Sequence, residues 1–111
     1  MKYGKPTLSN SQEKANELFL YLKSIGDYAT KEEIGVYLGV KNERSVRDII
    51  SLLATKKPIL SNSGGKGYKL AQTIDDLEEI EHTWAEIDSR IEQLQERKKP
   101  LIKFYEKYKK M

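Results

Sequence analysis

Apolar residues recur at steps of three and four in the first part of the chain, which is the spacing of one helix face. From Ser11 this stripe consists of Ala15, Leu18, Phe19, Leu22 and Ile25. Gly26 and Asp27 are predicted to end the helix, because such residues interrupt a helical pattern. Residues 1–10 contain glycine, proline, serine and asparagine, and we predict that they form a short flexible lead-in.

Two further helices are predicted before Pro58. Thr30 and Glu33 have the spacing of a capping box, in which each side chain bonds a free backbone amide of the first turn. This helix is expected to end at Gly39 and to turn inward Ile34, Tyr37 and Leu38. The next helix is expected to begin after Asn42 as its cap and to bury Val46, Ile49, Ile50 and Leu53.

Two short strands are predicted next, at residues 59–61 and 68–70. They bracket the run Asn-Ser-Gly-Gly-Lys-Gly at 62–67, which indicates a hairpin with a flexible, basic tip. Its glycines would let the tip approach another molecule closely without a clashing side chain. Taken alone, the same run also fits an ordinary hairpin turn.

The pattern changes from Thr73 onward to a sustained helix with an apolar seam. Seam residues follow alternating steps of three and four, an average period of 3.5 that is typical of a coiled coil: Leu77, Ile80, Trp84, Ile87, Ile91, Leu94, Lys98, Leu101, Tyr105 and Tyr108. Pro100 is expected to interrupt residues 72–111, because proline is unfavourable inside a helix. The tail is then either a kinked helix or a helical hairpin whose first helix ends near Lys98.

A domain of this size cannot bury the whole seam, so a partner is expected, and a second copy of the chain supplies one. The residues predicted to form the homodimer interface are Leu77, Ile80, Trp84, Ile87, Ile91, Leu94, Leu101 and Tyr105. The alternative is that the tail packs back on its own domain as a fourth helix, with Ile80 and Trp84 completing the core.

The formal net charge of +3 is unevenly distributed. Residues 1–71 hold 12 Lys and Arg against 7 Asp and Glu, residues 72–96 hold 1 against 9, and residues 97–111 hold 7 against 1. An antiparallel pair of tails, or a tail folded back at Pro100, would bring the acidic and basic blocks together, whereas a parallel pair would stack like charges. Both blocks could also simply be solvated helix faces.

The order of these elements resembles the winged helix-turn-helix superfamily, with the biotin-repressor type as the most similar subgroup. The residues that carry the resemblance are Thr30-Lys31-Glu32-Glu33-Ile34, Ser45-Val46-Arg47-Asp48-Ile49-Ile50 and Gly65-Lys66-Gly67-Tyr68-Lys69-Leu70. With its tail, the chain is also similar to short phage and prophage proteins of Gram-positive bacteria. The resemblance implies a mainly α fold with a small β-hairpin: a winged helix-turn-helix domain over residues 11–71, followed by a long C-terminal coiled-coil-like helix.

Double-stranded DNA is the partner that this resemblance implies, as for a transcriptional regulator or a replication-associated factor. A helix fits the major groove with its N-terminal residues at the base edges, where Arg can bind guanine and Asn adenine through two hydrogen bonds. Glu43 and Asp48 would repel phosphate there unless they are neutralised. The predicted DNA-binding residues are Thr30, Lys41, Asn42, Arg44, Ser45, Arg47 and Ser51, with Lys66 and Lys69 on the DNA backbone.

No catalytic function, cofactor, metal site or small-molecule ligand is predicted. The chain has no cysteine, and its one histidine, His82, is expected to be solvated among acidic residues of a helix. The absence of any long apolar run predicts a cytoplasmic protein without a membrane span. The alternative function is a protein-interaction adaptor that docks through the first domain and the tail without binding DNA. RNA binding is less favoured, because no exposed aromatic sheet is predicted.

Overall fold

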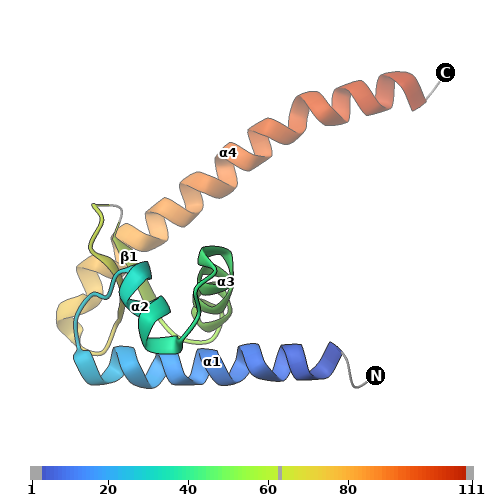
Figure 1. Ribbon diagram of the computed structural model, residues 1–111. Helices are drawn as coiled ribbons and strands as arrows, with labels where there is room; N and C mark the ends of the chain where they lie inside the picture. Colours follow the sequence, from blue (N-terminus) through green and yellow to red (C-terminus); the bar gives the residue numbers. More distant parts are fainter. Residues whose placement is uncertain (1–3, 63, 110–111) are drawn as a thin grey trace. The chain divides into compact units, whose positions relative to one another are not determined.

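The computed structural model describes residues 4–62 and 64–109, with side chains described from residue 10. The chain is mainly helical, with one antiparallel hairpin and a long C-terminal helix, as predicted (Figure 1). In order, the elements are α1 (Gly4–Ile25), α2 (Lys31–Leu38), α3 (Glu43–Ala54), β1 (Ile59–Asn62), β2 (Gly67–Leu70), the short 3-10 helix η1 (Ile74–Asp76) and α4 (Leu77–Lys109). The chain forms two compact units, one ending at Ile80 and the other beginning at Glu81.

Helix α1 begins earlier than the sequence pattern predicted. It starts at Gly4 rather than at Ser11, so the predicted lead-in over residues 1–10 is wrong for residues 4–10. Residues 1–3 lie outside the described residues. Pro6 is compatible with this longer helix because it stands in the first turn, where a backbone N–H has no partner within the helix.

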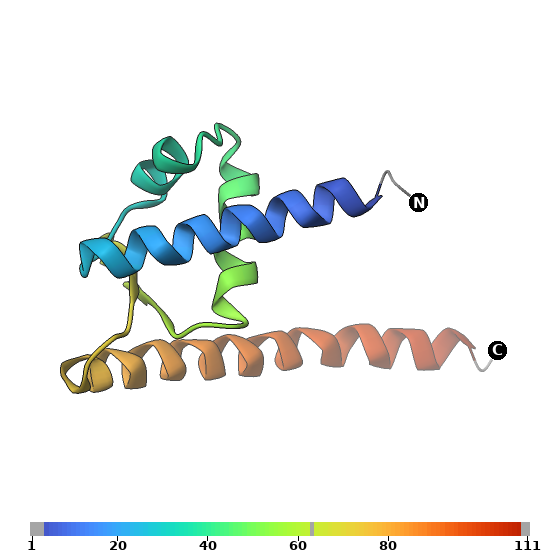
Figure 2. The same ribbon diagram turned by 90° about the horizontal axis from the view of Figure 1, so that it is seen from below.

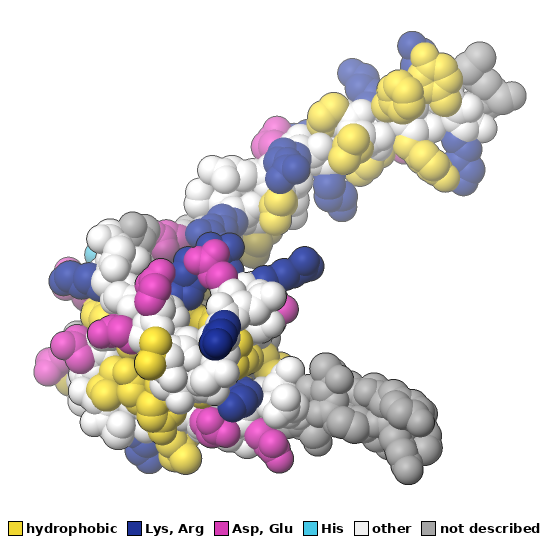
Figure 3. Space-filling model, in the orientation of Figure 1, with side chains coloured by type: hydrophobic (Ala, Val, Ile, Leu, Met, Phe, Trp, Pro, Cys, Tyr) yellow, Lys and Arg dark blue, Asp and Glu magenta, His cyan; other side chains and the backbone are white. Residues whose placement is uncertain are grey.

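Helix α4 is continuous past Pro100, so the predicted alternative of a helical hairpin, with a first helix that ends near Lys98, is wrong. A proline inside a helix removes one hydrogen bond, here the one to the carbonyl of Glu96. Because the surrounding residues are exposed, water can bond to that carbonyl instead. No described residue of α4 is buried, and Figure 3 shows hydrophobic side chains at the surface of this helix with Lys and Arg between them.

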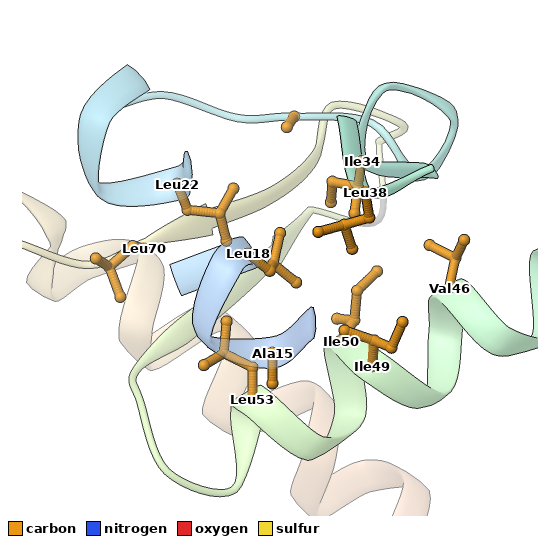
Figure 4. Close-up of a cluster of buried hydrophobic side chains, with 11 residues drawn as sticks. Ala15, Leu18, Leu22, Ile34, Leu38, Val46, Ile49, Ile50, Leu53 and Leu70 are labelled. Atoms are coloured by element: carbon orange, nitrogen blue, oxygen red, sulfur yellow. The ribbon is translucent and has the colours of Figure 1, made fainter. Parts of the chain in front are cut away.

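The core of the first unit lies where α1 packs against α2 and α3 (Figures 2 and 4). Most of the predicted inward residues are buried there: Ala15, Leu18, Leu22, Ile34, Leu38, Val46, Ile49, Ile50 and Leu53, joined by Leu70 of β2. Ile25 and Tyr37 are exceptions, since both are exposed. Tyr37 lies outside the core and stacks on Tyr21, with ring centroids 4.1 Å apart. The prediction that Tyr37 turns inward is therefore wrong.

Local capping fixes the ends of α2 and α3. Thr30 and Glu33 form the predicted capping box, and Gly39 adopts the left-handed conformation with φ of 70°. The predicted cap Asn42 accepts hydrogen bonds from the backbone N–H groups of Arg44 and Ser45. Lys14 of α1 adds a contact that the pattern did not predict, because its Nζ donates to the carbonyl oxygen of Leu38 at 2.8 Å. Its positive charge stabilises the C-terminal end of α2.

The hairpin has the predicted strands, and a bridge to the helical part holds it in place. Ile59 pairs with Leu70 and Asn62 with Gly67, in antiparallel register. Tyr68 exchanges two backbone hydrogen bonds, both of 2.8 Å, with Ala29, the residue just before the cap of α2. Gly67 makes this contact possible, because a Cβ atom there would collide with the carbonyl of Ala29.

A buried carboxylate joins the hairpin to the start of α4. Asp76 is 5% exposed, and it accepts hydrogen bonds from Lys69 Nζ at 2.9 Å and from the backbone N–H groups of Gln72 and Thr73. The hydrogen bond from Lys69 and the two backbone bonds lower the pKa of Asp76 to about 2. The same ion pair raises the pKa of Lys69. Asp76 therefore stabilises the folded state in its ionised form.

Asp76→Asn is expected to lower the free energy of unfolding at pH 7 by about 2 kcal/mol, because a pKa lowered by the hydrogen bonds from Lys69, Gln72 and Thr73 is equivalent to stabilisation of the native state. The contribution is fully present above pH 4, near the unfolded-state pKa, and is lost as the pH falls toward 2. Urea titrations between pH 7 and pH 3 would measure it, with Asp75→Asn as the exposed control. A difference between Asp76→Asn and the parent that stays constant down to pH 3 would contradict a role for the ionised carboxylate.

Candidate nucleic-acid interface

The N-terminal half of α3 presents a cluster of exposed polar and basic side chains. The inward positions Val46, Ile49 and Ile50 anchor the helix in the core, which fixes the direction of the other side chains. As predicted, those other side chains are exposed: Arg44, Ser45, Arg47, Asp48 and Ser51, with Lys41 and Asn42 just before the helix. Six of the nine predicted DNA-binding residues therefore lie on α3 or just before it.

Glu43 is neutralised by a lysine from another helix. Its carboxylate lies 2.8 Å from Lys31 Nζ, at the start of α2, and 3.9 Å from Arg47 Nη2. The hydrogen bond and the charge of Lys31, followed by the charge of Arg47, lower the pKa of Glu43. Lys31 therefore offsets the negative charge that would oppose phosphate, and Arg47, whose side chain is 61% exposed, remains at the surface. The sequence pattern did not single out Lys31.

Asn42 and Thr30 have local roles that restrict what else they can bind. The Oδ1 atom of Asn42 caps α3, at 2.8 Å from the backbone N of Arg44. Asparagine binds adenine through two hydrogen bonds, and its side-chain oxygen must accept one of them. Because the oxygen of Asn42 is already used in the cap, only its side-chain NH₂ remains as a donor toward a ligand. The hydroxyl oxygen of Thr30 accepts from the backbone N of Glu33 at 3.1 Å, which leaves its O–H as a donor.

The two lysines predicted in the hairpin differ in their surroundings. Lys66 is exposed in the turn between β1 and β2, as a phosphate contact requires. Lys69 points toward η1, where it binds Asp76 at 2.9 Å and lies 5.8 Å from the ring of Tyr28. Its charge is thus matched within the protein, and we leave Lys69 out of the candidate interface. In the sequence, the acidic Asp76 seven positions after Lys69 could have indicated this ion pair.

A groove adjoins the basic face at the turn between α2 and α3. Its volume is about 550 Å³, and its apolar wall includes Val36, Val40 and Val46. Val36 is 84% exposed, so its side chain is accessible to a binding partner at the groove. Buried Gly35 permits the tight turn beside the groove, because a Cβ atom there would lie 3.0 Å from the carbonyl oxygen of Val40.

The described residues contain no group of three or more His, Cys, Asp or Glu side chains that could hold a metal ion. None of the helices within residues 4–109 is long and apolar enough to cross a membrane. Comparison with known protein families, curated proteins and solved structures found no match to this chain. The candidate interface therefore rests on its own geometry.

Proposed function

We propose that the first unit is a winged helix-turn-helix domain that binds double-stranded DNA, with α3 as the recognition helix and the β1–β2 hairpin as the wing. The observation that carries this proposal is the exposed N-terminal half of α3, where Arg44 and Arg47 stand beside an acidic residue already paired with Lys31. A helix of this kind fits the major groove, and arginine is the side chain most often used to bind guanine. Lys66 in the wing contacts phosphate.

Self-association through α4 belongs to the same proposal. Two copies present two recognition helices, so the modest affinity of one domain is reinforced by a second contact on the same DNA. This arrangement suits a transcriptional regulator or a replication-associated factor, either of which needs DNA binding without catalysis.

The test is the salt dependence of DNA binding, measured by fluorescence anisotropy with a random 30-base-pair duplex. Each phosphate contact lowers the slope of log K against log salt by about 0.9, so the affinity is expected to fall steeply from low to moderate salt. Lys66→Ala is expected to make this slope shallower by about one unit per chain. Lys56→Ala, at the opposite end of α3 from Arg44, removes the same charge as a control and should leave the slope unchanged.

If the duplex is not bound at low salt, the DNA-binding proposal is wrong. If Lys66→Ala and Lys56→Ala change the slope equally, binding follows net charge and the wing has no specific role. Lys56 and Lys66 are each exposed, so neither variant is expected to disturb the fold. A change in the slope therefore reports on DNA binding rather than on folding.

A protein-interaction adaptor is the second candidate function, and the apolar groove with exposed Val36 favours it. An apolar helix face or loop of another protein would cover that groove without using the arginines of α3. Under this alternative, replacing Arg44 and Arg47 leaves function intact, whereas a charge in the α4 seam abolishes it.

A further inference from the structure

We infer that α4 pairs with α4 of a second copy in antiparallel orientation, with Ile91 of each chain packed against Leu94 of the other. This inference rests on the proposed self-association and specifies its partner and geometry. The starting observation is that the seam residues from Trp84 to Tyr108 lie uncovered on one exposed helix. Trp84 is 62% and Leu101 70% exposed, so a mainly apolar stripe, interrupted at Lys98, faces water in the single chain.

The continuity of α4 decides where the complementary charge comes from. Residues 77–92 carry six acidic and one basic side chain, whereas residues 93–109 carry two acidic and six basic ones. Because the helix does not turn back at Pro100, its basic half cannot lie against its own acidic half. A second molecule can then supply the opposite charges along the seam.

Charge complementarity selects the orientation of that second molecule. A parallel pair in register places acidic half on acidic half and basic half on basic half, which costs free energy over the whole length of the helix. An antiparallel pair places the acidic half of each chain along the basic half of the other. The second copy is therefore the occupant whose charge pattern fits the stripe.

The residues within the seam also favour the antiparallel orientation. In a parallel pair in register, Lys98 would face Lys98 of the partner copy, and two ammonium groups would share the apolar seam. In the antiparallel pair, the layers join Trp84 with Leu101, Ile87 with Lys98 and Ile91 with Leu94 of the opposite chain. Lys98 of each chain then lies against Ile87 of the opposite chain, and Ile87 is followed in the sequence by the acidic Asp88. The large indole of Trp84 also meets a leucine rather than a second indole.

A distance measurement between spin labels tests the orientation. The natural chain has no cysteine, so His82→Cys and Lys103→Cys each create a single labelling site on exposed residues. These two positions are 21 residues apart and equidistant from the centre of the proposed pair, so an antiparallel dimer separates two labels at position 82 by about 32 Å along the axis. A mixed dimer labelled at 82 in one chain and at 103 in the other is expected to give the shorter distance.

Pulsed electron paramagnetic resonance on the full chain, without DNA, measures both distances. A short distance between labels at 82 and 82, with a long one in the mixed dimer, would mean parallel pairing and would overturn this inference alone. A monomer by light scattering at the same concentration would overturn the self-association as well. Neither result bears on the contacts of the first unit with DNA, which the variants of that unit test separately.

Discussion

Ile91→Asp is expected to convert the dimer into a monomer, raising the dissociation constant for self-association by about a thousandfold or more. Each dimer contains two Ile91 side chains, and burying one isoleucine is worth about 1.5–3 kcal/mol. The substitution also places an unpaired carboxylate opposite Leu94 of the other chain, which adds a desolvation cost at both sites. The loss for the dimer is therefore at least about 4 kcal/mol, which corresponds to the stated factor.

Sedimentation equilibrium over a range of concentrations would measure this change, and Ser89→Asp is the matched control. Ser89 lies on the same helix and outside the seam, so it adds the same charge without entering the apolar stripe. Thermal unfolding of the first unit is expected to be unchanged in both variants, because its core contains no residue beyond Leu70. A dimer that survives Ile91→Asp would show that the seam is not the interface.

Replacing Arg44 and Arg47 together by alanine is expected to weaken binding to a preferred DNA sequence by about a hundredfold or more. An arginine that binds guanine through two hydrogen bonds contributes about 1–3 kcal/mol of discrimination, and the proposed function assigns this role to both residues. The sequence would first be selected from a random pool with the unmodified protein. Binding of each variant would then be compared between the selected duplex and a random one.

The matched control for the two arginines is Lys23→Ala with Lys56→Ala, which removes the same charge from exposed positions outside the N-terminal half of α3. A larger loss on the selected duplex than on the random one is the expected result, since base contacts matter only where the bases fit. An equal loss on both would assign the arginines to phosphate. No loss on either would remove α3 from the interface and favour the adaptor function.

The link between self-association and DNA binding can be read from the two variant series together. If Ile91→Asp also weakens binding to the selected duplex, while the affinity of one domain for a half-length duplex is unchanged, then two domains act on one DNA molecule. An unchanged affinity for the full duplex would separate the two activities.

Local patterns in the sequence determined the elements of the first unit and most of their ends, with the start of α1 as the exception. The caps at Thr30, Gly39 and Asn42 depend on residues within a few positions of each other, and the buried stripe of α3 repeats over two helical turns. Such contacts are set by helix and strand geometry before any packing occurs. The outward direction of Arg44 and Arg47 follows in the same way, because it is the complement of the buried face.

Only the tertiary structure decided how individual charged and aromatic side chains are used. Glu43 meets Lys31 twelve positions away, and Tyr37 stacks on Tyr21 sixteen positions away, through the packing of one helix on another. Lys69 likewise turns to Asp76 because the hairpin and η1 are adjacent in the fold. Side chains as long as these can reach several partners, so spacing along the chain does not select one. Helix α4 runs on through Pro100 because water can replace the bond that proline removes, and that depends on exposure rather than on propensity.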